Sequence, residues 1–298
     1  MEIVPFDKRD GFIWYNGVII PWQDAKVHVL NHSLHYGGCA FEGERVYSGH
    51  IFKLQEHTER LFKSAELLGY KIPYTVEQIN DATREIVKKQ NINDGYIRPF
   101  AWRGSEKMAI SAQQNSIHVA IATWEWPVYY ADRKKGIRLT YADWVRPAPN
   151  MAPVASKASG LYMICTLSKH KAESQGYQEA LMLDYRGYVA EATSANFFMV
   201  INGELHTPIA DCFLNGITRQ TVMDLARKRG IKVVERHFGP EELGKAQEAF
   251  LTGTAAEITP IREIEGRLGH YQFTVGNVTE TLMQDYSDLV THWVNTND

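Results

Sequence analysis

The sequence has little cysteine, little net charge and no long apolar run. Its three cysteines, Cys39, Cys165 and Cys212, are scattered and odd in number, so they offer neither a disulfide framework nor a CxxC metal site. A formal net charge of -3 over 298 residues gives no footprint for nucleic acid or an anionic membrane, so the expected ligand is small. No apolar stretch reaches the length of a membrane span, and the charged stretch after Met1 contains no apolar core of signal-peptide length. These shortages favour a reducing, cytoplasmic setting.

Length and composition are those of a globular protein with one large domain or two moderate ones. The hydrophobic fraction of 44% and the charged fraction of 22% are ordinary, and no internal repeat or low-complexity tract is present. After a buried-type strand at 118–123 come aromatic residues, a proline and a basic run, which is typical of a connecting segment. We therefore expect a small α+β domain over residues 1–125, a linker over 126–136 and a larger domain over 137–298.

Local patterns predict helices and strands in the first part of the chain. Asn16-Gly17 lies between two short apolar runs, which is a strong hairpin signal. Apolar residues recur at helical spacing from Leu54 to a stop at Gly69, and a second helix is expected over 76–90. A strand then begins at Gly95.

Two arginines in this part each have two interpretations. Arg60 falls beside the apolar stripe of its helix, either as a snorkelling side chain or as a guanidinium held inward for a phosphate. Alternation in the strand after Gly95 puts Tyr96 and Arg98 on one face, where they would either meet a carboxylate ligand or form an ordinary ion pair.

Three histidines are spaced like metal ligands on one face of a helix: His28, His32 and His35. The Val, Asn and Ser residues between them are indifferent helix formers, and no HExxH-type glutamate accompanies them. We therefore interpret them as loop-and-strand histidines and expect no metal site.

The second part of the chain contains strand, hairpin and helix patterns. A strand at 137–141 leads through a proline-rich stretch to Lys157, which we expect at the end of a strand and just before a helix over 161–175. That helix should turn inward the apolar residues Leu161, Ile164, Cys165 and Leu167. Hairpins are predicted over 180–191 and 197–207. Thr218 is typical of a cap for a helix that runs to Lys228, and a last helix is expected around 275–294.

The residues around Lys157 are small. The lysine lies in the stretch Val154-Ala155-Ser156-Lys157-Ala158-Ser159-Gly160-Leu161-Tyr162, where small neighbours let a planar ligand approach the backbone. A lysine that loses its water in such a setting has a lowered pKa, which makes its amine a nucleophile toward aldehydes. Any single lysine is more often a solvated surface charge, so the residues downstream decide between these readings.

Downstream, a carboxylate and two glycine-threonine turns follow. Glu191 lies late in a predicted strand, and a buried carboxylate there would keep a pyridine nitrogen protonated by raising its pKa. The turn Asn215-Gly216-Ile217-Thr218-Arg219 opens a helix, whose amides and dipole suit a phosphate. The turn Thr252-Gly253-Thr254-Ala255-Ala256-Glu257 offers further amides and a hydroxyl. Together with Lys157, these are the four parts needed to hold pyridoxal phosphate (PLP).

Several motifs occur in order along nearly the whole chain: Tyr36-Gly37, Phe41-Glu42-Gly43 with Arg45, Tyr96-Ile97-Arg98-Pro99, Lys157-Ala158-Ser159-Gly160-Leu161-Tyr162, Gly187-Tyr188-Val189-Ala190-Glu191, Gly216-Ile217-Thr218-Arg219 and Gly253-Thr254-Ala255-Ala256-Glu257-Ile258-Thr259-Pro260. Together they resemble the branched-chain amino acid aminotransferases, which are class IV aminotransferases of PLP fold type IV. The resemblance implies a mixed α/β fold, with a small N-terminal domain and a larger domain that contains a barrel-like sheet flanked by helices. Two features depart from the family. Glu44 stands where an aliphatic residue is common, and the loop Arg103-Gly104-Ser105-Glu106-Lys107-Met108 is more charged than expected of a purely apolar pocket rim.

The resemblance also implies a role for each site residue. Lys157 would form the Schiff base, Glu191 would partner the pyridine nitrogen, and Tyr162 would hydrogen-bond the phenolic oxygen of the cofactor. The phosphate would be held by Arg60, Gly216, Ile217, Thr218 and Thr254. The amides of Thr254 and Ala255 would take the substrate α-carboxylate, and Arg98 with Tyr96 would take the distal carboxylate of glutamate. The apolar pocket for Leu, Ile or Val side chains would be lined by Tyr36, Phe41, Tyr129 and Tyr162. Gly43 and Arg45 would also bind the substrate.

The implied activity is transamination between branched-chain L-amino acids and 2-oxoglutarate, with amino acids and 2-oxo acids as the only small-molecule partners. The site would lie at the interface of a homodimer, alone or within a larger oligomer of dimers, with Tyr36 and the region of Met108 and Ile110 reaching across. Alternatives in the same superfamily are a D-amino acid or (R)-amine transaminase and aminodeoxychorismate lyase. The histidine-rich stretch leaves a metal-dependent hydrolase as the remote alternative.

Overall fold

The computed structural model describes residues 4–126 and 135–293. This part of the chain divides into two compact units, which are treated separately below. The first unit contains residues 4–126 together with 156–160 and 293, and the second contains 135–155 and 161–292. The segment 156–160, which carries Lys157, therefore packs with the first unit although the second surrounds it in sequence.

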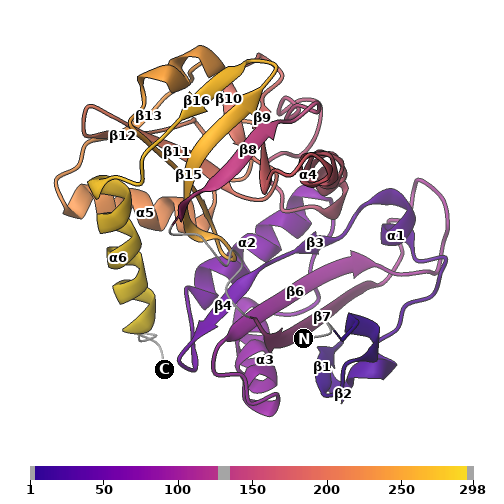
Figure 1. Cartoon of the computed structure of the whole chain (residues 1–298). Helices are drawn as coiled ribbons and strands as arrows, with labels where there is room; N and C mark the ends of the chain where they lie inside the picture. The colour runs from indigo at the N-terminus through magenta and orange to yellow at the C-terminus, as the bar shows by residue number, and fades with distance from the viewer. Residues whose placement is uncertain (1–3, 127–134, 294–298) are drawn as a thin grey trace. The chain divides into compact units, whose positions relative to one another are not determined.

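The first unit is a sheet with helices α2 and α3 packed on one face (Figure 1). Its strands follow the order β2-β1-β7-β6-β4-β5, and β3 pairs with β6. The strands are β1 (Phe12–Tyr15), β2 (Val18–Pro21), β3 (Ala40–Phe41), β4 (Glu44–Tyr47), β5 (His50–Ile51), β6 (Gly95–Arg103) and β7 (Ile117–Glu125). The helices are η1 (Phe6–Lys8), η2 (Trp22–Asp24), α1 (His32–Tyr36), α2 (Leu54–Leu67) and α3 (Val76–Lys89).

Turn and cap chemistry explains where these elements begin and end. Asn16 and Gly17 have φ of 49° and 94°, the left-handed conformation that a two-residue hairpin turn needs, so the predicted hairpin is confirmed as β1–β2. Thr75 and Gln78 form a capping box at the start of α3. Both predicted helices of this part are confirmed as α2 and α3.

Strand register gives the two faces of this sheet different chemistry. Phe41 lies opposite Phe100, and Arg45 lies opposite Tyr96, in antiparallel pairs. Because side chains alternate along a strand, the face away from the helices carries aromatic and basic side chains: Phe41, Arg45, Tyr96 and Arg98. The face towards the helices carries two acids beside the apolar core: Glu42, Glu44 and Val46. The predicted common face of Tyr96 and Arg98 is confirmed.

The second unit is built on a closed barrel. The path β10-β9-β8-β15-β14-β11 closes because β10 also pairs with β11, and β12, β13 and β16 extend the sheet. Its strands are β8 (Ile137–Tyr141), β9 (Glu179–Leu183), β10 (Val189–Ala192), β11 (Asn196–Ile201), β12 (Glu204–Thr207), β13 (Val233–Glu235), β14 (Glu248–Gly253), β15 (Glu257–Gly266) and β16 (Gly269–Gln272). Apolar side chains from all the closing strands form one core cluster, which includes Leu139, Phe197 and Leu251. The barrel-like sheet expected from the sequence is confirmed.

Helices flank this barrel (Figure 1). Helix α4 contacts β8 and β9, α5 contacts β13 and β14, and α6 contacts β14 and β15. The helices are η4 (Ser159–Tyr162), α4 (Met163–Ser174), α5 (Ile217–Lys228), η5 (Pro240–Lys245) and α6 (Asn277–Thr291). Within residues 4–126 and 135–293, no helix combines the length and the hydropathy needed to cross a membrane.

Three details differ from the sequence expectations. Lys157 does not lie at the end of a strand, because β8 ends at Tyr141 and the chain reaches the lysine through turns. Thr218 is not the cap of α5, because Gly216 occupies the N-cap position. Leu167 is 47% exposed rather than inward. The inward face of α4 is instead the one that carries Cys165, Ser168 and Ala172.

Candidate active site

Lys157 is held through its backbone against strand β3. Its N–H donates to Ser64 Oγ (3.0 Å), and its carbonyl oxygen accepts from the N–H of Phe41 (3.1 Å). The absence of side chains at Gly37 and Gly160 permits this approach, since a Cβ at Gly160 would lie 3.1 Å from the Gly37 carbonyl oxygen. The lysine is half-buried, with Nζ 5.0 Å from the centre of the Phe41 ring. The Lys157 amine therefore stands on a fixed backbone beside an apolar ring.

Phe41 also contacts a second cation, Arg98. The Arg98 Cζ lies 4.7 Å from the centre of the Phe41 ring, and its Nη2 donates to the Tyr96 hydroxyl at 3.1 Å. Gly43 leaves room for that phenol, because a Cβ there would lie 2.0 Å from Tyr96 Oη. These residues, which the sequence assigned to the substrate pocket, thus gather on one face of the sheet next to Lys157.

The same face carries guanidinium groups that are not fully satisfied. Arg45 is 9% exposed, and its Cζ lies 5.1 Å from the centre of the Tyr47 ring. The Nε atoms of Arg45 and Arg98 are both buried and have no hydrogen-bond partner within residues 4–126 and 135–293. Buried donors of charged groups are costly when they lack a partner, so this face favours an anionic ligand.

On the opposite face, Glu42 forms a buried cluster with residues of α2. Arg60 donates from Nε to Glu42 Oε1 (2.7 Å) and from Nη2 to Oε2 (2.8 Å), and His57 Nδ1 lies 2.7 Å from Oε2. Burial raises the pKa of the Glu42 carboxyl, but Arg60 and His57 outweigh burial and hold that pKa well below its ordinary value. Burial lowers the pKa of His57, and its bond to Glu42 offsets this only in part. Arg60 therefore lies inward, as one of its two interpretations required, while its phosphate role stays a prediction.

In the second unit, Glu191 lies on β10 and is 8% exposed. The buried guanidinium of Arg146 forms an ion pair with it, with 3.3 Å between Nε and Oε1, and donates from Nη1 to Cys165 Sγ at 3.3 Å. Burial alone would lower the pKa of Arg146, but Glu191, together with Cys165, Tyr162 and Cys212, outweighs burial and raises it. Burial raises the pKa of Cys165 to about 11, so the thiol beside this pair stays neutral. A buried carboxylate with a cationic neighbour suits the protonated nitrogen of a heterocycle.

The N-terminus of α5 offers backbone amides for an anion. Gly216 caps the helix with its backbone alone, without a side-chain cap, and the first helical hydrogen bond runs from Gln220 N–H to the Gly216 carbonyl. The amides of Ile217 and Thr218 precede that bond, so they belong to the donors that a helix start leaves unpaired. Such amides, together with the helix dipole, attract phosphate. The predicted helix-opening turn is confirmed, with Gly216 rather than Thr218 as the N-cap.

A buried arginine holds the loop before α5 in place through hydrogen bonds. Arg219 is fully buried and donates to Asn215 Oδ1 (2.8 Å), to the Pro208 carbonyl (2.8 Å) and to Glu235 Oε2 (2.7 Å). The sequence pointed to this residue only as part of a motif, and its anchoring contacts depend on β12 and β13, which lie on either side of it in the chain.

The second turn connects β14 to β15. The strand β14 ends at Gly253, and Thr254 and Ala255 are half-buried in the turn that follows. Just before it, the hydroxyl of Thr252 is buried and has no hydrogen-bond partner in the described part of the chain. A polar cradle with spare donors is what a phosphate or carboxylate would require here.

The remaining predicted residues lie further apart. Tyr162 is half-buried at the start of α4, where it packs with the cluster around Cys165. Tyr36, Met108 and Ile110 lie on the surface of the first unit, with exposures of 44%, 38% and 82%. Tyr129 and most of the expected linker 126–136 lie outside the described residues.

Sequence reasoning missed Arg146, His57 and Asn196. Arg146 was visible only as part of a proline-rich approach to Lys157, and His57 only as an apolar-face helix position. Asn196 had one usable signal, which is that asparagine is a poor strand former yet begins a strand of otherwise apolar residues.

The three spaced histidines do not form a ligand cluster in the described residues. His32 and His35 lie in the short helix α1, not in loops or strands as expected. The Nε2 atoms of His32 and His35 lie 2.9 Å from the carbonyl oxygens of Ala109 and Val29. The helix forms because Asn31 caps it by accepting from Ser33 and Leu34 N–H.

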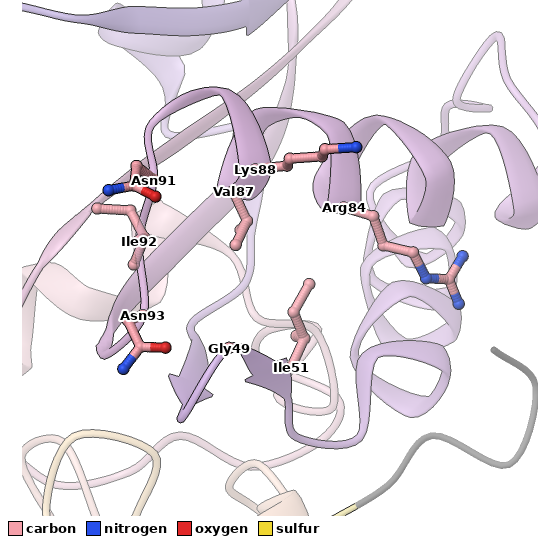
Figure 2. A pocket seen from close by; sticks show the side chains of 8 residues that line it. All are labelled: Gly49, Ile51, Arg84, Val87, Lys88, Asn91, Ile92 and Asn93. Carbon is pink, nitrogen blue, oxygen red and sulfur yellow. The ribbon is translucent and has the colours of Figure 1, made fainter.

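A surface hollow at the end of α3 contains none of these residues (Figure 2). It is lined by Gly49, Ile51, Arg84, Val87, Lys88, Asn91, Ile92 and Asn93. In Figure 2 the charged ends of Arg84 and Lys88 and the amides of Asn91 and Asn93 do not converge on one point, so no ligand-binding group is formed.

The chain is similar to known proteins over most of its length. The model of the family described as amino-transferase class IV matches residues 39–264. A branched-chain-amino-acid aminotransferase of Pseudomonas aeruginosa is 44% identical over 289 residues, covering 95% of this chain and 94% of the relative.

Two solved structures resemble the whole chain closely. The branched-chain aminotransferase of Thermoproteus uzoniensis, solved with norvaline, has a TM-score of 0.90 and 37% identity, with 95% of each chain covered. The branched-chain amino acid aminotransferase of Thermobaculum terrenum, solved in its PLP-form, has a TM-score of 0.84 and 32% identity, covering 95% of this chain and 94% of the other.

Proposed function

Because the chain belongs to the class IV aminotransferase family, we propose that it transfers an amino group between branched-chain L-amino acids and 2-oxoglutarate. It is a PLP-dependent branched-chain amino acid aminotransferase of fold type IV. The 2-oxoglutarate partner and the role of each residue are our proposals. The observation that carries them is that the Lys157 amine and the Arg98 guanidinium both lie beside the ring of Phe41.

The residues present fit the cofactor. When bound, PLP supplies an electron-accepting ring and an aldehyde carbon. Lys157 would hold the cofactor through its amine, and Glu191, charged beside Arg146, would keep a proton on the ring nitrogen. The Ile217 and Thr218 amides at the start of α5 would hold the phosphate, aided by Arg60 and Thr254.

Lys157 would also move the proton of the reaction. Its Nζ would take the proton from the α-carbon of the amino acid and hold it for return to the product. The backbone bonds to Ser64 and Phe41 fix the start of the side chain, so the amine has a short range of motion. The amides of Thr254 and Ala255 would hold the α-carboxylate, and Tyr162 would donate to the phenolic oxygen of the cofactor.

One pocket must accept both an aliphatic chain and a carboxylate. The Phe41 ring offers an apolar wall, and Arg98 lies over the same ring with its Nη2 on Tyr96. Because Arg98 Nε has no hydrogen-bond partner in residues 4–126 and 135–293, it can bind the distal carboxylate of glutamate without first breaking another bond. Arg45, with its own unsatisfied Nε, would add positive potential.

We further propose that the chain works as a homodimer. Large apolar side chains are exposed on and beside α1 and on the loop before β7: Val29 (72%), Leu34 (67%), Tyr36 (44%), Met108 (38%) and Ile110 (82%). The loop and α1 adjoin, because His32 Nε2 contacts the Ala109 carbonyl oxygen. Exposed apolar groups gathered in one region are typical of an interface. Leu34→Asp should give a monomer by light scattering, whereas Val18→Asp, at a residue 59% exposed on β2, should not.

The covalent role of Lys157 is tested by borohydride reduction of the PLP-supplied protein followed by peptide mapping. The expected adduct is on Lys157, and Lys157→Ala should lose both the visible absorbance of the bound cofactor and turnover. A colourless wild type, or an adduct on another lysine, would overturn the proposal. Spectral half-reactions with L-leucine and D-alanine test the substrate class, and reaction with D-alanine alone would contradict it.

The Arg98 role is tested by separating the two substrates. Arg98→Ala should lower kcat/KM for glutamate about 10- to 100-fold, the value of a lost charged hydrogen bond, while leucine is affected far less. Equal losses for leucine and glutamate would show that Arg98 only supports the pocket.

A further inference from the structure

The closure of the barrel brings Glu191 and Asn196 together. These residues are the pair in register where β10 meets β11, the contact that joins the two ends of the barrel sheet. Asn196 is 5% exposed. It also lies opposite Thr252 of β14, just before the second turn of the site. A buried side chain at this junction must satisfy its polar groups inside the protein.

Both ends of the Asn196 amide make hydrogen bonds. Its Nδ2 donates to Glu191 Oε2 (3.0 Å) and to the Leu214 carbonyl oxygen (3.0 Å), and its Oδ1 accepts from the Gly216 N–H (3.1 Å). The reversed amide would turn its oxygen towards the Glu191 carboxylate and its NH₂ towards the Gly216 N–H, so only one orientation fits. One side chain therefore joins the proposed partner of the ring nitrogen to the N-cap of α5.

The Glu191 carboxylate is consequently held from two sides. Arg146 lies against Oε1 and Asn196 against Oε2. On the other side of Asn196, the fit to Gly216 is close, because a Cβ at that glycine would lie 2.3 Å from Asn196 Oδ1. A longer or differently shaped side chain at 196 would move either the carboxylate or the turn.

We propose that Asn196 is a positioning residue that fixes the distance between the two anchor points of PLP, the Glu191 carboxylate and the Gly216 turn. This inference rests on the proposed function, which assigns the ring nitrogen to Glu191 and the phosphate to the start of α5. Neither aspartate nor alanine at position 196 could make the same three hydrogen bonds. Aspartate would keep the acceptor for Gly216 but place a second carboxylate against Glu191, and alanine would break all three bonds.

The test measures PLP affinity by absorbance for the wild type, Asn196→Asp and Asn196→Ala, each relative to the wild type at the same pH. Asn196→Ala should bind PLP about 10- to 100-fold more weakly at every pH, because it loses a hydrogen bond to a charged group. Asn196→Asp should lose as much at high pH and recover at low pH, when the carboxyl pair at 191 and 196 takes up a proton. The charged group beside that pair is Arg146, which also faces the titratable side chains of Cys165, Tyr162 and Cys212.

The matched control is Asn80→Asp. Asn80 is also a buried asparagine with both ends bonded, to Thr58 (2.6 Å) and Gln55 (2.6 Å), but it lies between α2 and α3. The Asn80→Asp variant should therefore keep the wild-type PLP affinity at every pH. Asn196→Asp with wild-type affinity across the pH range, or a loss no larger than that of Asn80→Asp, overturns the proposal.

A second variant approaches the same contact from the turn. Gly216→Ala should weaken PLP binding in the wild type, and it should cost clearly less in the Asn196→Ala background, where the clashing oxygen is gone. Additive losses would overturn the Asn196 role, even if Asn196→Asp does not fold. A wild type that binds no PLP would instead overturn the proposed function, so the two failures are distinguishable.

Discussion

The buried carboxyl of Glu44 should make the protein less stable as the pH rises. Glu44 is fully buried on β4, and neither of its oxygens has a hydrogen-bond partner in the described residues. Burial raises the pKa of Glu44 well above its ordinary value, the neighbouring Glu42 charge raises it further, and Arg60 lowers it only in part. The folded protein therefore carries this group as the neutral acid under conditions where an unfolded chain would ionise it.

The sign of the pH effect follows from proton binding. Because the folded pKa lies above the unfolded one, the stability contribution is fully present below the unfolded pKa and is lost as the pH rises towards the folded pKa. Each pH unit in that window costs about 1.4 kcal/mol. Between about pH 5 and pH 7 the loss is therefore at most about 3 kcal/mol.

Two substitutions separate the charge from the polarity. Glu44→Gln keeps the shape but cannot ionise, so it should match the wild type near pH 5 and exceed its stability near pH 7 by up to about 3 kcal/mol. Glu44→Leu also removes the unsatisfied polar atoms, which adds about 1–3 kcal/mol at both pH values. Residue 44 lies among apolar side chains such as Val46 and Ile97, so leucine has suitable neighbours.

The assay is urea unfolding of the cofactor-free protein, followed by tryptophan fluorescence over this pH range. The control is Glu85→Gln at an exposed position of α3, which should show the pH dependence of the wild type. A constant difference between Glu44→Gln and the wild type from pH 5 to pH 7 would refute the reasoning, because it would mean that Glu44 titrates alike in both states.

Three other substitutions have defined outcomes. Arg60→Met leaves the Glu42 carboxylate without its bidentate partner, so it should lower the free energy of unfolding by about 3–5 kcal/mol. The measurement is urea unfolding of the cofactor-free protein, and an unchanged midpoint would contradict a structural role for the pair. Gly43→Ala should lower kcat/KM for glutamate more than for leucine in steady-state assays, because the new Cβ would lie 2.0 Å from Tyr96 Oη. A larger loss for leucine would contradict the assignment of Tyr96 and Arg98 to the glutamate carboxylate. Gly37→Ala should lower the Tm more than Gly203→Ala. Both glycines have positive φ (65° and 79°), but only a Cβ at residue 37 would meet backbone, at 2.9 Å from Gly160 Cα. Equal shifts in Tm would assign the effect to φ alone.

Local patterns in the sequence were sufficient for most helices and hairpins. The Asn16-Gly17 turn and the alternation of Tyr96 and Arg98 depend on neighbours within a few residues, so they were predictable. Lys157 and Glu191 stood out because motif and chemistry agreed. Their surroundings were not predictable, since Lys157 is fastened to Ser64 and Phe41, which are far away in sequence.

The errors have physical causes of the same kind. Threonine is a good N-cap by type, yet the Asn196 amide oxygen already accepts from the Gly216 N–H, and the N-cap lies at Gly216 rather than at Thr218. Leu167 is apolar, but the face of α4 that becomes inward is chosen by contact with β8 and β9. Neither contact can be read from the local sequence, because each joins segments that meet only in the folded chain.

The closure of the barrel at β10 and β11 has a consequence for solubility. The pairing of β10 with β11 covers an edge that could otherwise serve as a template for another chain, whereas parting at this seam would expose two strands with unpaired N–H and C=O groups. Glu191 lies at that seam, so its replacement would affect self-association as well as chemistry. Variants that lack this carboxylate should therefore be tested for insoluble aggregate as well as for cofactor absorbance.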